Sequence, residues 1–146
     1  MVNYSIDTDL IKFRPNILNN GAYDTSWAHD EAYSLINTTL EAEWYMKEAP
    51  NHDVDPATTA MNVAKLRATQ FKYLSVYKAL ELIYVSLTKD TPLDDGFYAW
   101  AAHFRKEYDN ELQKILKIGV EYDWDATGTI TQAEKYIPQR RNLEKC

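Results

Sequence analysis

The sequence has a single cysteine, and it is the last residue, Cys146. A disulfide within the chain is therefore impossible, and we expect the protein to work in a reducing compartment. No apolar run approaches the roughly 20 residues that a helix needs to cross a bilayer. The polar opening MVNYSIDTDL does not have the pattern of a signal peptide. We therefore expect no association with a membrane.

Glycine and proline are also scarce, with 4 and 5 copies. Little of the chain can be low-complexity linker, and 146 residues are enough for one domain with a real core. We predict a single domain in three parts. Residues 1–24 form an N-terminal arm, residues 25–118 a helical bundle, and residues 119–146 an acidic turn followed by a C-terminal tail.

The sequence has no excess of basic residues. It contains 16 Lys and Arg and 22 Asp and Glu, which gives a net charge of −6. This excess of acidic residues argues against a nucleic-acid-binding site formed by a basic surface. Aromatic residues, in contrast, make up 13% of the chain and include 11 Tyr and 4 Trp. Such an excess is typical either of a surface that meets partners or of a tyrosine-rich core.

The alternating pattern of strands is missing, and helical periodicity takes its place. A short helix is possible at residues 7–13. The first long helix should begin at Thr25 or Ser26 and run to about Glu48, where Ala49 and Pro50 stop it. Its apolar stripe consists of Trp27, Ala28, Ala32, Leu35, Ile36, Leu40 and Trp44.

The longest predicted helix spans residues 55–89 and is central to the fold. Asp55 is a favourable N-cap, and Pro56 falls in the first turn, where no amide partner is lost. Pro92 lies just beyond its end. A continuous helix of this length would measure about 50 Å, whereas a compact globule of this size is about 40 Å across. We therefore expect one end of the helix to project.

The second half of this helix, residues 73–87, is apolar on nearly every side, with Lys78 and Glu81 as its only charges. A helix of that kind must be covered by other elements or by other subunits. We expect a charge at Leu80 or Ile83 to unfold the protein.

A third helix should run from Asp94 or Asp95 to about Lys117, and Gly119 should end it in the left-handed conformation. Its apolar face comprises Phe97, Trp100, Ala101, Phe104, Tyr108, Leu112 and Ile115. The predicted fold class is therefore all-α, a helical bundle around one long central helix, with an extended N-terminal arm and a C-terminal tail.

Residues 123–134, DWDATGTITQAE, match the template of an EF-hand calcium loop. Gly128 stands at the sharp turn, where φ is positive, and Ile130 is the apolar residue that fixes the loop to its neighbours. A hard cation needs converging oxygen atoms, which alternate residues of a tight turn can supply. The candidate Ca²⁺ ligands are Asp123, Asp125, Thr127, the Thr129 carbonyl and the bidentate Glu134.

A metal-free turn is the alternative, in which Asp123 and Asp125 accept backbone amides and Glu134 caps nearby residues. The context favours this alternative, because Gly119 interrupts the entering helix and Pro138 shortens the leaving one. No second loop of this kind is present in the sequence. Both interpretations stay open.

The sequence has no recognisable catalytic pattern, so we predict that the protein is not an enzyme. The three histidines, His29, His52 and His103, lie in different segments, and none has an acidic residue three positions earlier. The Glu-x-x-His pattern of carboxylate-bridged metal bundles is therefore missing. No glycine-rich phosphate loop is found.

The order of the segments along the chain is similar to that of a known protein family. LEAEWY is followed by KLRATQFKYLSVYKALELIYVSLTK, DGFYAWAAHFRKEYDNEL, IGVEYDWDATGTITQAEK and the arginine-bearing IPQRRNLEK. From about residue 25 to residue 145, this succession resembles the small helical head–tail connector proteins of tailed bacteriophages, also called neck or adaptor proteins.

The resemblance implies a structural virion protein, made in the host cytoplasm, whose copies form a ring in the neck, often a dodecamer. The ring would join the portal protein to the next neck or tail protein. DNA would pass through its channel only as cargo, and a negative lining would let the duplex slide. The alternative function is a monomeric, calcium-dependent helical binding module with a single EF-hand-like loop.

The resemblance also assigns a role to the C-terminal segment, residues 136–145, as the tail that docks on the portal. Arg140 and Arg141 would pair with acidic groups there, because the planar guanidinium holds a carboxylate at two points. The alternative for this pair is a solvated basic end. The predicted docking residues are Tyr136, Ile137, Arg140, Arg141 and Leu143.

Overall fold

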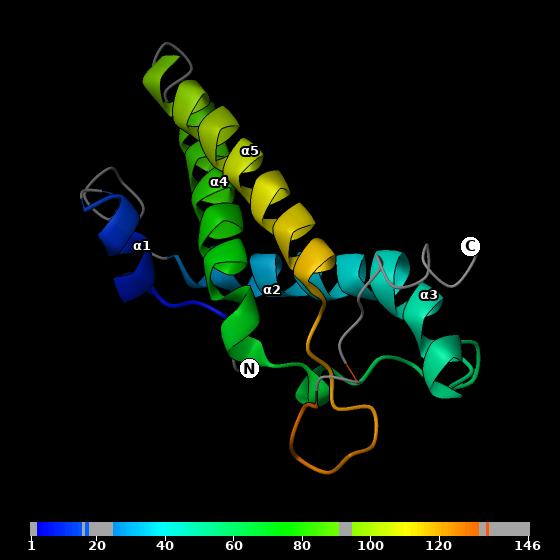
Figure 1. Ribbon diagram of the computed structural model, residues 1–146. Coiled ribbons are helices and arrows are strands. Elements are labelled where there is room, and N and C mark those ends of the chain that lie inside the picture. The colour runs from blue at the N-terminus through cyan, green and yellow to red at the C-terminus, as the bar shows by residue number, and fades with distance from the viewer. Residues whose placement is uncertain (1–2, 16, 18–24, 91–94, 132–133, 135–146) are drawn as a thin grey trace. The chain divides into compact units, whose positions relative to one another are not determined.

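The structure is a computed structural model that describes residues 3–15, 17, 25–90, 95–131 and 134, and this part is mostly helical (Figure 1). The main helices are α1 (Asp7–Phe13), α2 (Ser26–Leu40), α3 (Met46–Glu48), α4 (Lys72–Asp90) and α5 (Asp95–Ile118). Within the described ranges no strand is formed, and the only bridge recorded is an isolated antiparallel one between Leu66 and Tyr122. The predicted all-α class is confirmed.

The chain divides into two compact units, each assembled from two separated segments. The first unit comprises residues 1–36 and 71–112, and the second comprises residues 37–70 and 113–146. The division into an arm, a bundle and a tail within a single domain stays a prediction.

Helix α1 occupies the range predicted for it, and a buried carboxylate fixes its start. The Ile6 amide donates to Asp9 Oδ2 over 3.1 Å, and Lys72 Nζ lies 3.0 Å from Asp9 Oδ1. Burial raises the pKa of Asp9, but the Ile6 amide and the Lys72 ammonium outweigh it and hold that pKa below its ordinary value. The Asp9 carboxylate thereby joins α1 to the start of α4.

The first long helix is confirmed from Ser26 to Glu48, but it contains a π-helical segment, η2 (Glu41–Tyr45), which the sequence did not predict. After α3 the helical run ends in a 3₁₀ turn, η3 (Ala49–His52), whose first turn holds Pro50. Both Trp44 and Tyr45 are buried. The wider π turn brings the directions of successive side chains closer together, which lets both rings face inward.

The predicted helix over residues 55–89 is wrong in its first half, because α4 begins only at Lys72. Asp55 does cap, but only a turn: its carboxylate accepts the Ala57 amide and its carbonyl accepts the Thr58 and Thr59 amides. The helix that forms has 19 residues, or about 28 Å at about 1.5 Å per residue. The predicted continuous helix of about 50 Å, with one projecting end, is therefore not formed.

Residues 60–71 form two short 3₁₀ turns instead, η4 (Val63–Lys65) and η5 (Ala68–Phe71). The Asn62 side chain accepts the Ala64 amide over 3.0 Å, which gives the backbone a local alternative to a helix. Leu66 is drawn into the bridge with Tyr122. Pairing with a segment distant in the sequence therefore overrides the helical propensity of this stretch.

The core of the first unit lies where α4 and α5 run side by side (Figure 1). The Tyr84 and Phe104 rings stack at 6.0 Å with an interplanar angle of 8°. Leu80 and Ile83 are 0% and 1% exposed, as the apolar pattern predicted. The buried cluster consists of Leu10, Ile17, Ala28, Ala32, Val76, Ala79, Leu80, Ile83, Tyr84, Leu87, Ala101 and Phe104.

Helix α5 begins and ends within a residue of its predicted bounds. Gly119 follows it with φ of 115°, and its amide donates to the Ile115 carbonyl over 2.9 Å. The predicted left-handed stop is therefore confirmed. It turns the chain toward the acidic loop of the second unit.

Candidate functional site

The segment that leads into the acidic loop is clamped by Gln70. The Gln70 side chain donates to the Gly119 carbonyl over 2.8 Å and accepts the Glu121 amide over 2.9 Å. Next to this clamp, the Arg67 amide donates to the Glu121 carbonyl and the Asp123 amide donates to the Lys65 carbonyl. The backbone is thus fixed as far as the first predicted calcium ligand.

An aromatic cluster anchors the second residue of the loop, Trp124. Its ring stacks on His52 at 4.2 Å and 5°, and on Tyr45 at 5.7 Å and 7°. Tyr122 and Trp44 complete the cluster, with ring centroids 4.5 Å and 5.7 Å from that of Trp124. Burial raises the pKa of Tyr45 and of Tyr122. Trp124 is held by rings on several sides, so the two aspartates that flank it are also positioned.

The loop closes on the carboxylate of Asp123. The Thr127 amide donates to Asp123 Oδ1 over 3.1 Å, and the Gly128 amide donates to Asp123 Oδ2 over 2.8 Å. Gly128 has φ of 84°, which confirms the predicted sharp turn. Ala126 is also left-handed, at φ of 57°, which costs a residue with a Cβ about 1 kcal/mol.

Glu134 closes the loop from its other end and is only 6% exposed. Its Oε1 accepts the Asp125 amide over 3.2 Å, and its Oε2 accepts the Thr131 amide over 2.6 Å. The Thr131 hydroxyl also donates to Oε2, over 3.0 Å. Both oxygens of the buried carboxylate are therefore used to hold the loop.

Three of the predicted calcium ligands converge. One carboxylate oxygen from each of Asp123, Asp125 and Glu134 lies within 4.8 Å of the other two. The Thr127 hydroxyl donates to Asp125 Oδ1 over 2.8 Å and to the Thr129 carbonyl over 3.1 Å. The structure thus brings all five predicted ligand residues into one small loop.

The donor set fits a hard cation. It consists of carboxylate, hydroxyl and carbonyl oxygens, and each carboxylate keeps lone pairs beyond those that accept amides. Hydrogen bonding by the Thr127 hydroxyl lowers the pKa of Asp125, which keeps this carboxylate ionised at neutral pH. The same hydrogen bonds also satisfy the loop without an ion, as the metal-free interpretation requires. Geometry alone therefore accommodates both interpretations.

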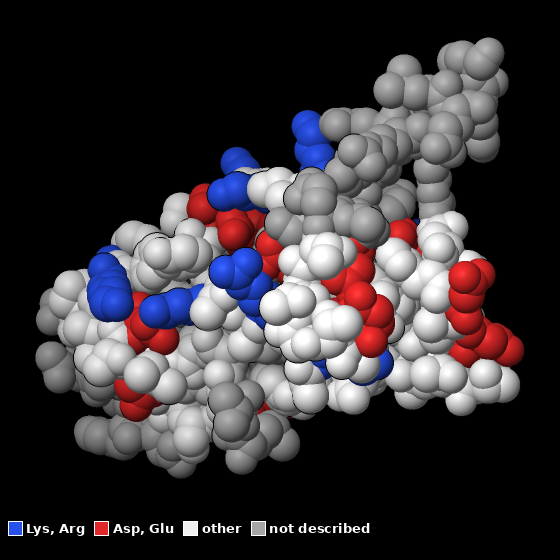
Figure 2. Space-filling model, turned by 60° about the horizontal axis from the view of Figure 1, so that its bottom comes forward, with Lys and Arg blue, Asp and Glu red and all other residues white. Residues whose placement is uncertain are grey.

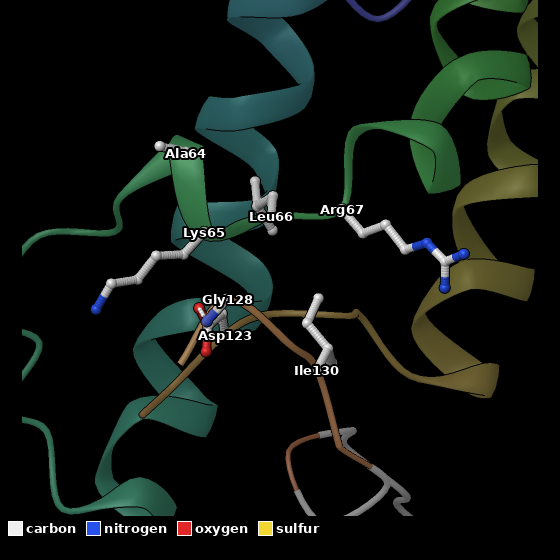
Figure 3. A pocket seen from close by; sticks show the side chains of 7 residues that line it. All are labelled: Ala64, Lys65, Leu66, Arg67, Asp123, Gly128 and Ile130. Atoms are coloured by element: carbon white, nitrogen blue, oxygen red, sulfur yellow. Dashed lines mark hydrogen bonds between the residues drawn. The ribbon is translucent and has the colours of Figure 1, made fainter. Parts of the chain in front are cut away.

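A pocket of about 390 Å³ lies between the loop and residues 64–67 (Figure 3). Asp123, Gly128 and Ile130 line one side of this pocket. The role of Ile130 in fixing the loop to its neighbours stays a prediction. The side chains of Lys65 and Arg67 point away from each other, and Arg67 pairs with Glu121 at 3.0 Å. These cations do not converge on a common ligand.

The predicted docking residues Tyr136, Ile137, Arg140, Arg141 and Leu143 lie outside the described residues, as does Pro138. Their role stays a prediction. The aromatic cluster, by contrast, was not predicted, because the number of aromatic residues in a sequence does not show which rings stack on one another. The adjacent aromatic residues at 44–45 and the YDW sequence at 122–124 are the features of the sequence that could have indicated this cluster.

A hydroxyl, an imidazole and a carboxylate also meet in the first unit. Ser5 Oγ lies 2.8 Å from His29 Nδ1, and His29 Nε2 lies 3.0 Å from Asp7 Oδ1. Ser5 is only 2% exposed and also contacts Ser75 Oγ, at 2.8 Å. A hydroxyl shielded in this way cannot reach a substrate, so the network serves to join the N-terminal segment to α2 and α4.

The surface in Figure 2 carries acidic and basic side chains interspersed, without a broad basic patch among the described residues on that face. None of the described helices combines the length and the apolar character needed to cross a membrane. Comparison with protein-family models, with curated proteins and with solved structures gives no match to this chain.

Proposed function

We propose that the protein is a head–tail connector subunit of a tailed bacteriophage, which forms a ring between the portal and the tail. The proposal rests on the order of the segments, in which an all-α body is followed by an acidic loop and an arginine-bearing tail. The observation that carries it is the buried Glu134, whose carboxylate holds both the Asp125 amide and the Thr131 amide. In this proposal, a loop closed in this way sets the residue at which the docking tail begins.

Two further features support the proposal. The acidic balance of the chain suits a conduit along which DNA must slide. Several large apolar side chains of the described part are exposed, and in a ring some of them would be covered by neighbouring subunits. These are Ile6, Ile11, Phe13, Trp27, Met46, Tyr73, Val85, Tyr98 and Ile118. The predicted projecting helix does not support the proposal, because α4 has only 19 residues.

Binding to the portal tests this function. The purified protein is mixed with the portal protein encoded by the same genome and followed by sedimentation velocity. We expect a joint species, and we expect Arg140→Ala with Arg141→Ala to weaken it by about tenfold or more, since each lost charge-assisted pair costs about 1.5–3 kcal/mol. Lys114→Ala with Lys117→Ala removes the same charge from exposed positions of α5 and should leave binding unchanged.

Calcium binding is a second candidate function, favoured by the carboxylate oxygens that meet within 4.8 Å. The residues that would hold Ca²⁺ are Asp123, Asp125, Thr127, Thr129 and Glu134. A bound ion would add charge neutralisation to a loop whose acidic groups otherwise repel one another. In this proposal the ion would therefore make the existing loop more rigid, and the loop would not depend on the ion to form.

Calorimetry of chelator-treated protein tests this second function. We expect Ca²⁺ to bind with a Kd of about 0.1–1 mM, in the range of weak single loops. Glu134→Gln should weaken binding by about tenfold or more, because it removes the bidentate carboxylate. Glu43→Gln, at an exposed position outside the loop, is the matched control. Absence of heat at millimolar Ca²⁺ would leave the loop as a metal-free turn.

A further inference from the structure

A chain of ring contacts joins α1, α4 and α5 in the first unit. The Phe13 ring lies edge-on to Tyr73 at 6.1 Å and to Tyr77 at 5.5 Å. The Tyr77 and Trp100 rings both lie against the buried Phe104, at 6.4 Å and 5.8 Å. Phe13 and Tyr73 are 37% and 54% exposed, and Tyr77 and Trp100 are half-buried. We call Phe13, Tyr73, Tyr77 and Trp100 the aromatic face.

One end of the aromatic face carries a cation that no carboxylate neutralises. The Arg14 guanidinium lies 3.8 Å from the centroid of the Trp100 ring, and its Nε donates to the Tyr84 hydroxyl over 2.7 Å. Within the described residues no ion pair is recorded for Arg14. The ring and the hydroxyl hold the guanidinium in place and leave its two terminal nitrogens, which match the geometry of a carboxylate, for another partner.

The described carboxylates of α1 and α4 have partners of their own, so none of them is left over for Arg14. The contacts are Asp7 with His29, Asp9 with Lys12 and Lys72, and Glu81 with Lys78 and Arg105.

The other end of the aromatic face carries two carboxylates without a cation. Glu107 and Glu111 are half-buried and lie near Tyr77. Burial raises the pKa of Tyr77, and the carboxylates of Glu111 and Glu107 raise it further. His103 and Lys114 are each one turn away from them on α5, but within the described residues no ion pair joins either to these glutamates.

The two ends cannot neutralise each other. Trp100, which holds Arg14, and Glu107 are two turns apart on α5, or about 10 Å. Trp100, Glu107 and Glu111 lie within about 20° of one line along the helix, so they share a side of it. The face therefore presents a positive end, a row of rings and a negative end.

We propose that the aromatic face binds an amphipathic helix of a partner protein that carries an acidic and a basic residue two turns apart. Apolar side chains of this helix pack on Phe13 and Tyr73. Its acidic residue pairs with Arg14, and its basic residue pairs with Glu107 and Glu111. This inference does not depend on the proposed function.

The separation of the charges selects a helix as the partner. Seven residues of a helix span about 10 Å and bring the side chains back to the same side. In a strand the same distance is about three residues, whose end side chains point to opposite faces. A helix can thus present both charges and the apolar residues between them to one surface, which is a common mode of peptide recognition.

Three synthetic peptides test the proposal. Each has about 15 residues, the length at which a helix becomes marginally stable in water. They share a Leu- and Ala-rich sequence and differ only at two positions two turns apart, which hold Glu and Lys, two Glu, or two Lys. Fluorescence anisotropy of the labelled peptides measures the Kd. We expect the Glu/Lys peptide to bind the wild type about tenfold more tightly than the others, because each of those places like charges together at one end.

Variants of the protein should change which peptide is preferred. Arg14→Glu makes both ends of the face acidic, so it should bind the two-Lys peptide most tightly. Glu107→Lys with Glu111→Lys makes both ends basic and should favour the two-Glu peptide. Should Arg14→Glu fail to fold, Arg14→Met removes the charge, and it should bind the Glu/Lys and two-Lys peptides equally.

Matched controls make the outcome specific. Lys106→Glu reverses a charge at an exposed position of α5 that is turned away from the line of Trp100 and Glu107. Glu41→Lys with Glu43→Lys reverses two exposed charges in the second unit. Both should keep the order of affinities of the wild type. Circular dichroism establishes that each variant is folded.

The inference fails if no peptide binds, or if the variants leave the preference unchanged. It also fails if the wild type binds the two-Lys peptide most tightly, as its net charge of −6 alone would favour. Self-association that is lost in both face variants, measured by sedimentation velocity, would make a second copy the occupant and overturn the proposal. None of these outcomes involves the portal, so the proposed function is tested separately.

Discussion

Replacing Ile83 by aspartate is expected to unfold the first unit. Ile83 is 1% exposed and belongs to the buried cluster between α4 and α5. The substitution removes an apolar side chain worth about 1.5–3 kcal/mol and adds a carboxylate whose burial costs several kcal/mol more. A domain of this size has only about 5–15 kcal/mol of stability, so the variant should lose its cooperative thermal transition.

Val85→Asp is the matched control, because it makes a similar change two residues along the same helix at an exposed position. We expect this control to keep the helical circular dichroism spectrum and a melting transition within a few degrees of the wild type. A folded Ile83→Asp variant with a normal transition would show that the buried face of α4 has been assigned wrongly.

Replacing Trp124 by alanine is expected to destabilise the second unit by about 3 kcal/mol or more. The change removes the ring that stacks on both His52 and Tyr45. It also frees the backbone between Asp123 and Asp125, so any calcium affinity of the loop should fall with it. Urea unfolding followed by circular dichroism measures the first effect, and calorimetry measures the second.

Two controls separate the stacking from other roles of Trp124. Trp124→Phe keeps a ring and removes an indole N–H that is buried without an acceptor among the described residues, so it should cost far less than alanine. Trp27→Ala removes an exposed indole and should cost less than about 1 kcal/mol. A stability loss for Trp124→Ala no larger than that of Trp27→Ala would contradict the anchoring role of the cluster.

Local signals explain what the sequence could predict. The run from Ser26 to Glu48 and helix α5 follow from apolar periodicity and from stop signals such as Pro50 and Gly119, which act within a few residues. The loop was predictable for the same reason, since its oxygen donors and Gly128 lie within twelve consecutive residues. Such features need no knowledge of the rest of the chain.

Distant contacts explain what the sequence could not predict. Asp55 and Pro56 begin a turn that has the signature of a helix start, but Leu66 and Gln70 make their hydrogen-bonding contacts with residues 119–122 instead. The stacking of Trp124 on Tyr45 likewise joins residues far apart in the sequence. These pairings leave no mark in the apolar periodicity of either segment.

The most direct measurement is electron microscopy of the purified protein mixed with a portal protein encoded by the same genome. The proposed connector function predicts closed rings of this chain seated on the portal, and their loss when residues 136–146 are deleted from an otherwise folded protein. A protein that remains dispersed beside bare portals, or rings that still dock without those residues, would contradict it.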